Sequence, residues 1–123
     1  MRIQIIDDEA PIAGALGDFL TSLGYDCRIY TDPRLAVSDY DRERFEVVIT
    51  DLLMPGLDGI AVLDRIIAAY PGAMVIAMTG FADTESAVAC LNHGAYAYFR
   101  KPLDLRRLCN TLKRAEKELL VSS

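Results

Sequence analysis

The amino-acid sequence predicts an α/β fold, a doubly wound five-stranded parallel sheet with helices on both faces. Short apolar runs alternate with longer stretches whose apolar residues recur at helical spacing. Several of the runs are almost continuously apolar, which indicates strands covered on both faces, and polar residues follow most of them. The predicted strands are residues 3–6, 25–30, 45–49, 74–78 and 95–99.

The composition of each strand predicts its place in the sheet. The first, third and fourth strands contain almost only apolar residues, so we expect them at the centre. The second strand alternates, with Tyr25, Cys27 and Ile29 in one row and Asp26 and Arg28 in the other. Such alternation is typical of an edge strand that has one face closer to water.

Stripes of apolar residues between the strands predict helices that pack on the sheet. The three stripes are Ile12, Leu16, Phe19, Leu20 and Leu23; Ile60, Leu63, Ile66 and Ile67; and Leu105, Leu108, Leu112, Ala115 and Leu119. Pro11 suits a first helical turn, and Gly24 suits a left-handed helix cap. The expected N-caps are Asp32, Asp58 and Asp83.

Length, composition and charge exclude several classes of protein. The 123 residues suit one domain, 1–123, and the apolar and charged fractions of 52% and 25% are those of a globular protein. No apolar run is long enough to cross a membrane and the start of the chain does not resemble a signal peptide, so we expect a cytoplasmic location. The net charge of −5 argues against direct binding of nucleic acid.

The cysteines and the basic residues near the chain end have ordinary explanations. Cys27, Cys90 and Cys109 are far apart and form neither a CxxC pair nor a metal-binding pattern with histidine, which favours reduced structural thiols. The basic residues are Arg100, Lys101, Arg106, Arg107, Lys113, Arg114 and Lys117. They indicate the solvated face of a helix or, alternatively, a protein-docking surface.

Polar residues follow four of the five predicted strands. Asp7 and Asp8 follow the first, Asp51 comes shortly after the third, Thr79 follows the fourth and Lys101 follows the fifth. The carboxyl ends of parallel strands share one edge of the sheet, and ligand sites form there where the strand order reverses. For the order 2-1-3-4-5 this point lies between the first and third strands. We therefore expect the three aspartates to meet there, with Thr79 and Lys101 beside them.

Three carboxylates in one small space need a counter-charge. Two unit charges about 4 Å apart repel each other by roughly 4 kcal/mol at an effective dielectric constant near 20. Lys101 supplies one positive charge, so a divalent cation is expected as well, and oxygen ligands favour Mg²⁺. Carboxylates can form acyl phosphates, and a site of this kind suits phosphoryl transfer with Asp51 as the acceptor.

Four short motifs together resemble the signature of bacterial response regulator receiver domains. They are Asp7-Asp8-Glu9, residues 51–59 with the pattern D-x-x-M-P-x-x-D-G, Met78-Thr79-Gly80 and Lys101-Pro102. The pattern in residues 51–59 is highly specific, and the resemblance extends over the whole chain. It implies a flavodoxin-like sheet of strand order 2-1-3-4-5.

The resemblance also implies a phosphorylation reaction and the residues that perform it. Asp51 would be phosphorylated by a sensor histidine kinase or a phosphotransfer protein. A Mg²⁺ ion would be held by Asp8, Asp51 and the backbone carbonyl of Leu53, with Asp7 helping in the first or second coordination shell. Lys101 would contact the phosphoryl oxygens.

The same resemblance implies a conformational switch. Thr79 would close on the phosphoryl group, Tyr98 would change rotamer, and the surface of the fourth helix, fifth strand and fifth helix would change. The peptide bond before Pro102 is often cis at this position of the family. The apolar Leu53 and Phe81 occupy positions where a polar side chain can orient the attacking water, which predicts slow hydrolysis of the phosphorylated form.

Other interpretations fit these residues less well. An aspartate-nucleophile phosphatase needs a D-x-D motif after the first strand, and a flavin-binding protein needs a phosphate-cradling loop rich in glycine and hydroxyls there. A receiver-like module that is never phosphorylated usually lacks an acid, the acceptor or the lysine. We therefore expect a signalling switch that catalyses only its own phosphorylation and dephosphorylation, and that acts on an output domain or effector protein that the sequence does not identify. His93, the single histidine, is interpreted as a helix-end residue without a role.

Overall fold

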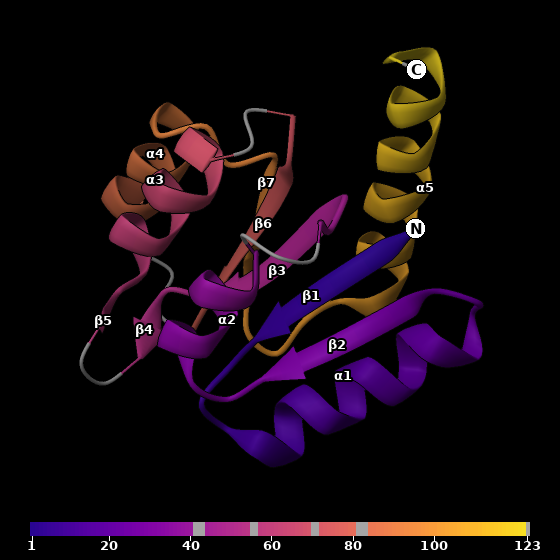
Figure 1. Ribbon diagram of the computed structural model, residues 1–123, viewed down its shortest axis with the longest axis horizontal. Helices are drawn as coiled ribbons and strands as arrows, with labels where there is room; N and C mark the ends of the chain where they lie inside the picture. Colours follow the sequence, from indigo (N-terminus) through magenta and orange to yellow (C-terminus); the bar gives the residue numbers. More distant parts are fainter. Residues whose placement is uncertain (41–43, 55–56, 70–71, 81–83, 123) are drawn as a thin grey trace.

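The computed structural model describes residues 1–40, 44–54, 57–69, 72–80 and 84–122. Its central sheet consists of β1 (Arg2–Ile6), β2 (Asp26–Tyr30), β3 (Val47–Asp51), β6 (Met74–Thr79) and β7 (Ala97–Arg100). The strands lie in the order β2-β1-β3-β6-β7, and each neighbouring pair is parallel (Figure 1). The strand order predicted from the sequence is therefore confirmed.

Within the described residues, five helices cover the sheet, and their bounds are α1 (Ala10–Ser22), α2 (Pro33–Tyr40), α3 (Gly59–Ala69), α4 (Thr84–Asn92) and α5 (Leu105–Ser122). Buried residues of α1 and α5 form one core with Ile3, Ile5 and Ile49 of the sheet. Buried residues of α2, α3 and α4 form a second core with the alternate strand positions, such as Ile6 and Val48. The helices thus lie on both faces of the sheet, as the sequence predicts (Figure 1).

The burial of the strands agrees with their predicted places. β3 is buried throughout, and β1 and β6 are buried except at their first residues. β2 lies at one edge and alternates between half-buried and exposed residues over Asp26, Cys27 and Arg28. Ile29 breaks this alternation, because 42% of its surface is exposed.

The strands differ from the prediction in their bounds and in a small additional sheet. The third strand was expected at residues 45–49, but Phe45 packs in the core ahead of the ladder, and β3 runs from Val47 to Asp51. The fifth begins at Ala97 and ends at Arg100. β4 (Leu53–Met54) and β5 (Leu57–Asp58) pair as an antiparallel ribbon directly after β3. Strands of two residues are too short to show an alternating pattern in the sequence.

Helix α1 faces the sheet with only part of the predicted apolar stripe. Its buried residues are Ala13, Leu16, Gly17 and Leu20, whereas Ile12 and Leu23 are 41% and 50% exposed. Gly17 explains the difference, because a Cβ atom at this position would lie 2.5 Å from Cδ1 of Ile29. The helix therefore approaches β2 along its small residues, and part of its apolar stripe remains at the surface.

The predicted helix ends are confirmed where the structure describes them. Pro11 lies in the first turn of α1, and Gly24 adopts a φ of 97° just after the helix. The backbone N–H of Arg34 donates to Oδ1 of Asp32 at 2.9 Å, so Asp32 caps α2. The side chain of Asp58 and all of Asp83 lie outside the described residues.

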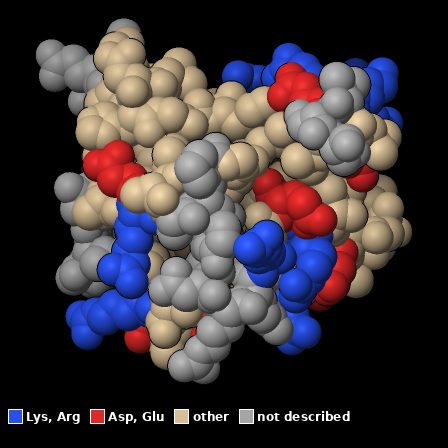
Figure 2. Space-filling model, turned by 45° about the horizontal axis from the view of Figure 1, so that its top comes forward, with Lys and Arg blue, Asp and Glu red and all other residues tan. Residues whose placement is uncertain are grey.

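Two of the arginines in α5 pack on aromatic rings, one in β7 and one just before it. The guanidinium carbon of Arg107 lies 4.7 Å from the ring centre of Phe99, and that of Arg114 lies 5.8 Å from the ring centre of Tyr96. Figure 2 shows one face of the molecule, on which basic and acidic residues lie interspersed. For these two arginines the simpler interpretation, a helix face with packing contacts, is therefore sufficient.

The cysteines and the helices match the other structural expectations. Cys27, Cys90 and Cys109 are free thiols, and Cys90 is fully buried. Burial raises the pKa of the Cys90 thiol, as expected for an unreactive core cysteine. Within the described residues, no helix combines the length and apolar character that crossing a bilayer requires.

Candidate functional site

The candidate site lies at the carboxyl ends of β1 and β3, which are neighbours in the centre of the sheet (Figure 1). Asp7 follows the last residue of β1, and Asp51 is the last residue of β3. From β1 the chain continues to the edge strand β2, and from β3 it continues toward β6 on the other side. The strand order therefore reverses here, which is where ligand sites form in open α/β sheets.

Three carboxylates meet at this point, as the sequence predicts. Asp7, Asp8 and Asp51 each offer an oxygen atom, and these oxygens lie within 4.8 Å of one another. Asp7 is fully buried, Asp51 is 4% exposed, and Asp8 is exposed. The cluster thus has two buried carboxylates and one at the solvent side, from which a small ion or substrate can enter.

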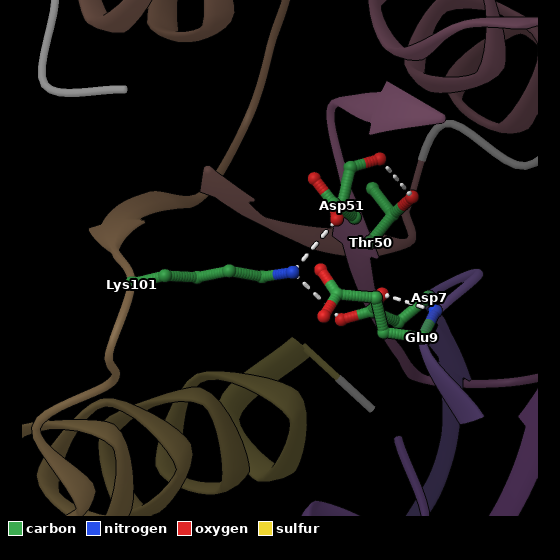
Figure 3. A network of polar contacts seen from close by, with 5 residues as sticks. All are labelled: Asp7, Glu9, Thr50, Asp51 and Lys101. Carbon is green, nitrogen blue, oxygen red and sulfur yellow. Dashed lines mark hydrogen bonds and ion pairs between the residues drawn. The ribbon is translucent and has the colours of Figure 1, made fainter. Parts of the chain in front are cut away.

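Lys101 joins the two buried carboxylates (Figure 3). Its Nζ donates to Oδ2 of Asp7 at 2.8 Å and to Oδ2 of Asp51 at 2.7 Å. Burial of the lysine lowers its pKa, but the hydrogen bonds to Asp51 and Asp7 and their negative charges outweigh burial, and the pKa of Lys101 is raised above its usual value. The ammonium group is therefore charged at neutral pH.

Backbone contacts hold these side chains in place. The backbone N–H of Glu9 donates to Oδ1 of Asp7 at 3.0 Å (Figure 3), and the N–H of Asp7 donates to the carbonyl of Tyr30 at 3.0 Å. The N–H of Lys101 donates to the carbonyl of Thr79 at 2.7 Å. Both residues are thereby tied to neighbouring strands, so the site has a fixed geometry before any ligand binds.

The charges of the site favour a divalent cation. Three carboxylates and one ammonium group leave a net charge of −2 at the cluster, which a divalent cation would neutralise. Both oxygens of Asp7 already accept hydrogen bonds, one from Glu9 and one from Lys101. A hard cation such as Mg²⁺ prefers oxygen ligands and keeps several waters, and the donors present here fit it.

The other predicted site residues that the structure describes lie in β6, β7 and β4. Thr79 is buried at the end of β6 and pairs with Arg100 across the ladder. Tyr98 is half-buried on β7, and its side chain packs against the core that faces α2, α3 and α4. Leu53 lies in β4 and pairs with Asp58, whereas its side chain and Phe81 lie outside the described residues. The Lys101–Pro102 peptide bond is cis.

The structure also contains an apolar groove that the sequence analysis does not predict. It has a volume of about 580 Å³ and runs between α1 and the segment that follows Lys101, with Ile12, Phe19, Pro102 and Leu105 among its lining residues. Lys101 lines it as well, so the groove begins next to the carboxylate cluster. Ile12 and Leu105 are exposed, although they belong to apolar stripes that the sequence predicts to be buried. The groove could therefore not be predicted from the sequence.

Comparisons with known proteins agree with this geometry. The sequence profile of the response regulator receiver domain matches residues 3–113. The chain is 34% identical to the transcriptional regulatory protein ZraR of Salmonella typhimurium over 92% of this chain and 26% of ZraR. It is 31% identical to the C4-dicarboxylate transport transcriptional regulatory protein DctD of Rhizobium meliloti over 94% of this chain and 25% of DctD. The chain thus spans about a quarter of the length of these relatives.

Solved structures share the whole fold. A CheY-like receiver domain protein from Methanospirillum hungatei JF-1 superposes with a TM-score of 0.88 at 31% identity, covering 95% of this chain and 97% of the other. The beryllofluoride-activated NtrC4 receiver domain dimer gives 0.90 at 32% identity, with the same coverage. Response regulator TrrA from Thermotoga maritima, solved in complex with Mg²⁺ and BeF, gives 0.83 at 25% identity over 93% of this chain and 97% of that chain. The chain therefore belongs to the response regulator receiver domain family of two-component signalling.

Proposed function

We propose that this receiver domain is a phosphorylation switch that accepts a phosphoryl group on Asp51. The observation that carries the proposal is the bridge from Lys101 to Asp7 and Asp51, beside three carboxylates whose oxygens lie within 4.8 Å. The bridge supports the proposal because Lys101 would supply a positive charge to phosphoryl oxygens on Asp51, and charge neutralisation is a main requirement of phosphoryl transfer. The domain would catalyse only its own phosphorylation and dephosphorylation.

The metal ligands would be Asp8, Asp51 and the backbone carbonyl of Leu53. Asp7 would take part mainly by holding Lys101, because both of its oxygens already accept hydrogen bonds. When bound, Mg²⁺ would supply the positive charge that neutralises the phosphoryl oxygens and the acceptor.

The transfer step would use the carboxylate of Asp51 as the nucleophile. One of its oxygens would attack the phosphorus atom of a phosphohistidine, an oxygen–phosphorus bond would form, and the phosphorus–nitrogen bond would break. The electron pair of that bond would leave with the imidazole of the donor. Lys101 would stay protonated throughout, since its pKa is raised, and would contact the phosphoryl oxygens.

The donor would be a sensor histidine kinase or a phosphotransfer protein that docks on the groove between α1 and the segment after Lys101. The groove is apolar, and it shares Lys101 with the carboxylate cluster. A partner helix bound in the groove would therefore present a histidine side chain within reach of Asp51. An apolar groove of this kind suits an amphipathic helix.

Phosphorylation would be read out by the surface of α4, β7 and α5. Thr79 would close on the phosphoryl group and Tyr98 would change rotamer, which would alter this surface for an output domain or effector protein. The relatives ZraR and DctD, which are about four times longer than the matched segment, are transcriptional regulators by name. Direct nucleic-acid binding would belong to other parts of such proteins.

The acceptor is tested by phosphorylation with a small donor and with a partner. With Mg²⁺ and acetyl phosphate, intact-mass analysis should show one added phosphoryl group in the wild type and none in Asp51→Asn. Ile12→Ser should leave this reaction unchanged and slow transfer from a phosphohistidine protein about tenfold, because one apolar docking contact is worth on the order of 1 kcal/mol or more.

The matched control for docking is Leu120→Ser, since Leu120 is 76% exposed near the far end of α5. It should affect neither reaction. Undiminished labelling of Asp51→Asn would place the acceptor on another residue. Equal slowing by Ile12→Ser with both donors would refute the docking role of the groove.

A further inference from the structure

The C-terminal end of α4 is fastened to α3 by the single histidine of the chain. His93 directly follows the helix, and its Nδ1 lies 2.7 Å from Oδ1 of Asp64 on α3. Both side chains are about half exposed. The pair therefore links the two helices at the surface, away from the carboxylate cluster.

A second contact fixes the same end of α4. Gly94 has a φ of 103°, and a Cβ atom there would lie 2.9 Å from Cδ1 of Ile67 on α3. In the last turn of the helix, Cys90 is fully buried in the core that also contains Leu63 of α3. The end of α4 is thus attached to α3 by a hydrogen bond, a close backbone approach and core packing.

Two apolar residues of α4 face the solvent. Val88 and Leu91 are 49% and 52% exposed. The beginning of the helix, at Thr84, is the end that follows Thr79 along the chain. A displacement of Thr79 would therefore affect the first turn of α4 before it affected the last turn.

We propose that the His93–Asp64 pair makes the C-terminal end of α4 a pivot, so that activation moves the first turn of the helix and leaves its last turn on α3. The proposal rests on the proposed phosphorylation of Asp51. His93 and Asp64 then act as positioning residues, because they contact neither the acceptor nor the carboxylate cluster. They determine which part of the α4 surface changes for a partner.

Amide hydrogen exchange with and without Mg²⁺ and beryllofluoride tests the pivot. In the wild type, activation should speed exchange at the start of α4 and leave the amides of His93 and Ala95 unchanged; these amides donate to the carbonyls of Ala89 and Cys90. In His93→Gln and Asp64→Asn, activation should speed exchange at His93 or its replacement and at Ala95 by roughly two- to five-fold, the factor expected for losing an exposed side-chain contact.

The comparison of resting and activated states separates a pivot from ordinary stabilisation. A purely structural contact would change exchange equally in both states, and that result would overturn the proposal. Asp18→Asn, which removes an exposed carboxylate from α1, should behave as the wild type. The exchanged pair Asp64→His with His93→Asp should restore the wild-type pattern, and failure to restore it would also overturn the proposal.

Fluorine NMR of bound beryllofluoride distinguishes failure of the pivot from failure of the proposed function. A bound signal that disappears in Asp51→Asn, together with unchanged exchange in the His93 and Asp64 variants, would overturn the pivot alone. Absence of a bound signal in the wild type would overturn the proposed function and the pivot with it.

Discussion

Lys101 and Asp51 are joined by a hydrogen bond of 2.7 Å from Nζ to Oδ2, although 50 positions separate them in the sequence. Asp51 ends the central strand β3, and Lys101 follows the edge strand β7, so the bond links the centre of the sheet to its border. The same ammonium group also binds Asp7. Folding thus brings one positive charge to two buried negative ones, and the consequences of this arrangement can be measured.

Removing this charge should destabilise the fold. In Lys101→Met two carboxylates, Asp7 and Asp51, lose their buried partner, and we expect a loss of about 3 kcal/mol in the free energy of unfolding. Urea denaturation at neutral pH with a chelator present measures it. Lys113→Met, which removes an exposed lysine of α5, is the control and should cost less than about 0.5 kcal/mol. Equal losses in the two variants would show that the bridge does not stabilise the protein.

The contribution of Lys101 should persist at mildly alkaline pH and disappear only at high pH. The folded protein raises the pKa of this lysine above its ordinary value of 10.5, so the folded state holds the proton more tightly than the unfolded state. The stability difference between wild type and Lys101→Met should therefore be constant from about pH 7 to 10 and shrink above about pH 10.5. Denaturation at a series of pH values measures it. A difference that already shrinks below pH 9 would contradict the raised pKa.

Mg²⁺ should stabilise the wild type through Asp8. A ligand at about 100 times its dissociation constant adds roughly 2.7 kcal/mol to the free energy of unfolding. We expect Asp8→Asn to weaken Mg²⁺ binding about tenfold and so to lose about 1.4 kcal/mol of this gain. Thermal or urea unfolding with and without Mg²⁺ measures the gain in the wild type and in Asp8→Asn. Asp18→Asn, which removes a carboxylate outside the cluster, should keep the full gain. If Asp8→Asn showed the same Mg²⁺-dependent gain in stability as the wild type, Asp8 would not be a metal ligand.

The central strands and the meeting of the aspartates could be predicted from local patterns, whereas the complete strand order was implied by the resemblance to receiver domains. Continuous apolar runs identify central strands, and a polar residue directly after a strand must lie at the edge of the sheet. Asp7, Asp51 and Lys101 could therefore be assigned to one site without knowledge of any contact. The parallel topology shared by the five strands of the central sheet is what brings them together.

Features that depend on contacts between distant residues could not be predicted. Gly17 of α1 is buried and closely approaches Ile29 of β2, and the apolar spacing of the helix does not predict this contact. The groove beside Lys101 is lined in part by Ile12, which the apolar spacing predicts to be buried but which is exposed. The contact between His93 and Asp64 connects residues that are 29 positions apart in the sequence, and neither residue belongs to a motif.

The lifetime of the phosphorylated form is predicted from two residues that follow Asp51 and Thr79 in the sequence. Leu53 and Phe81 come two positions after Asp51 and Thr79, where a polar side chain can orient the attacking water. Neither can hydrogen-bond a water molecule, and misplacing the attacking water can slow hydrolysis on the order of 10²-fold. We therefore expect a long-lived aspartyl phosphate that suits slow regulation.

Loss of the acyl phosphate after removal of the donor tests this prediction. Leu53→Asn with Phe81→Glu should shorten the lifetime by a factor approaching 10², because the new side chains can hold water in line with the bond that breaks. Leu53→Met with Phe81→Leu keeps both positions apolar and should keep the wild-type lifetime, which separates the effect of polarity from that of substitution. If the wild type loses its phosphoryl group as fast as the polar variant, another group positions the water, and the apolar pair has no influence on the lifetime.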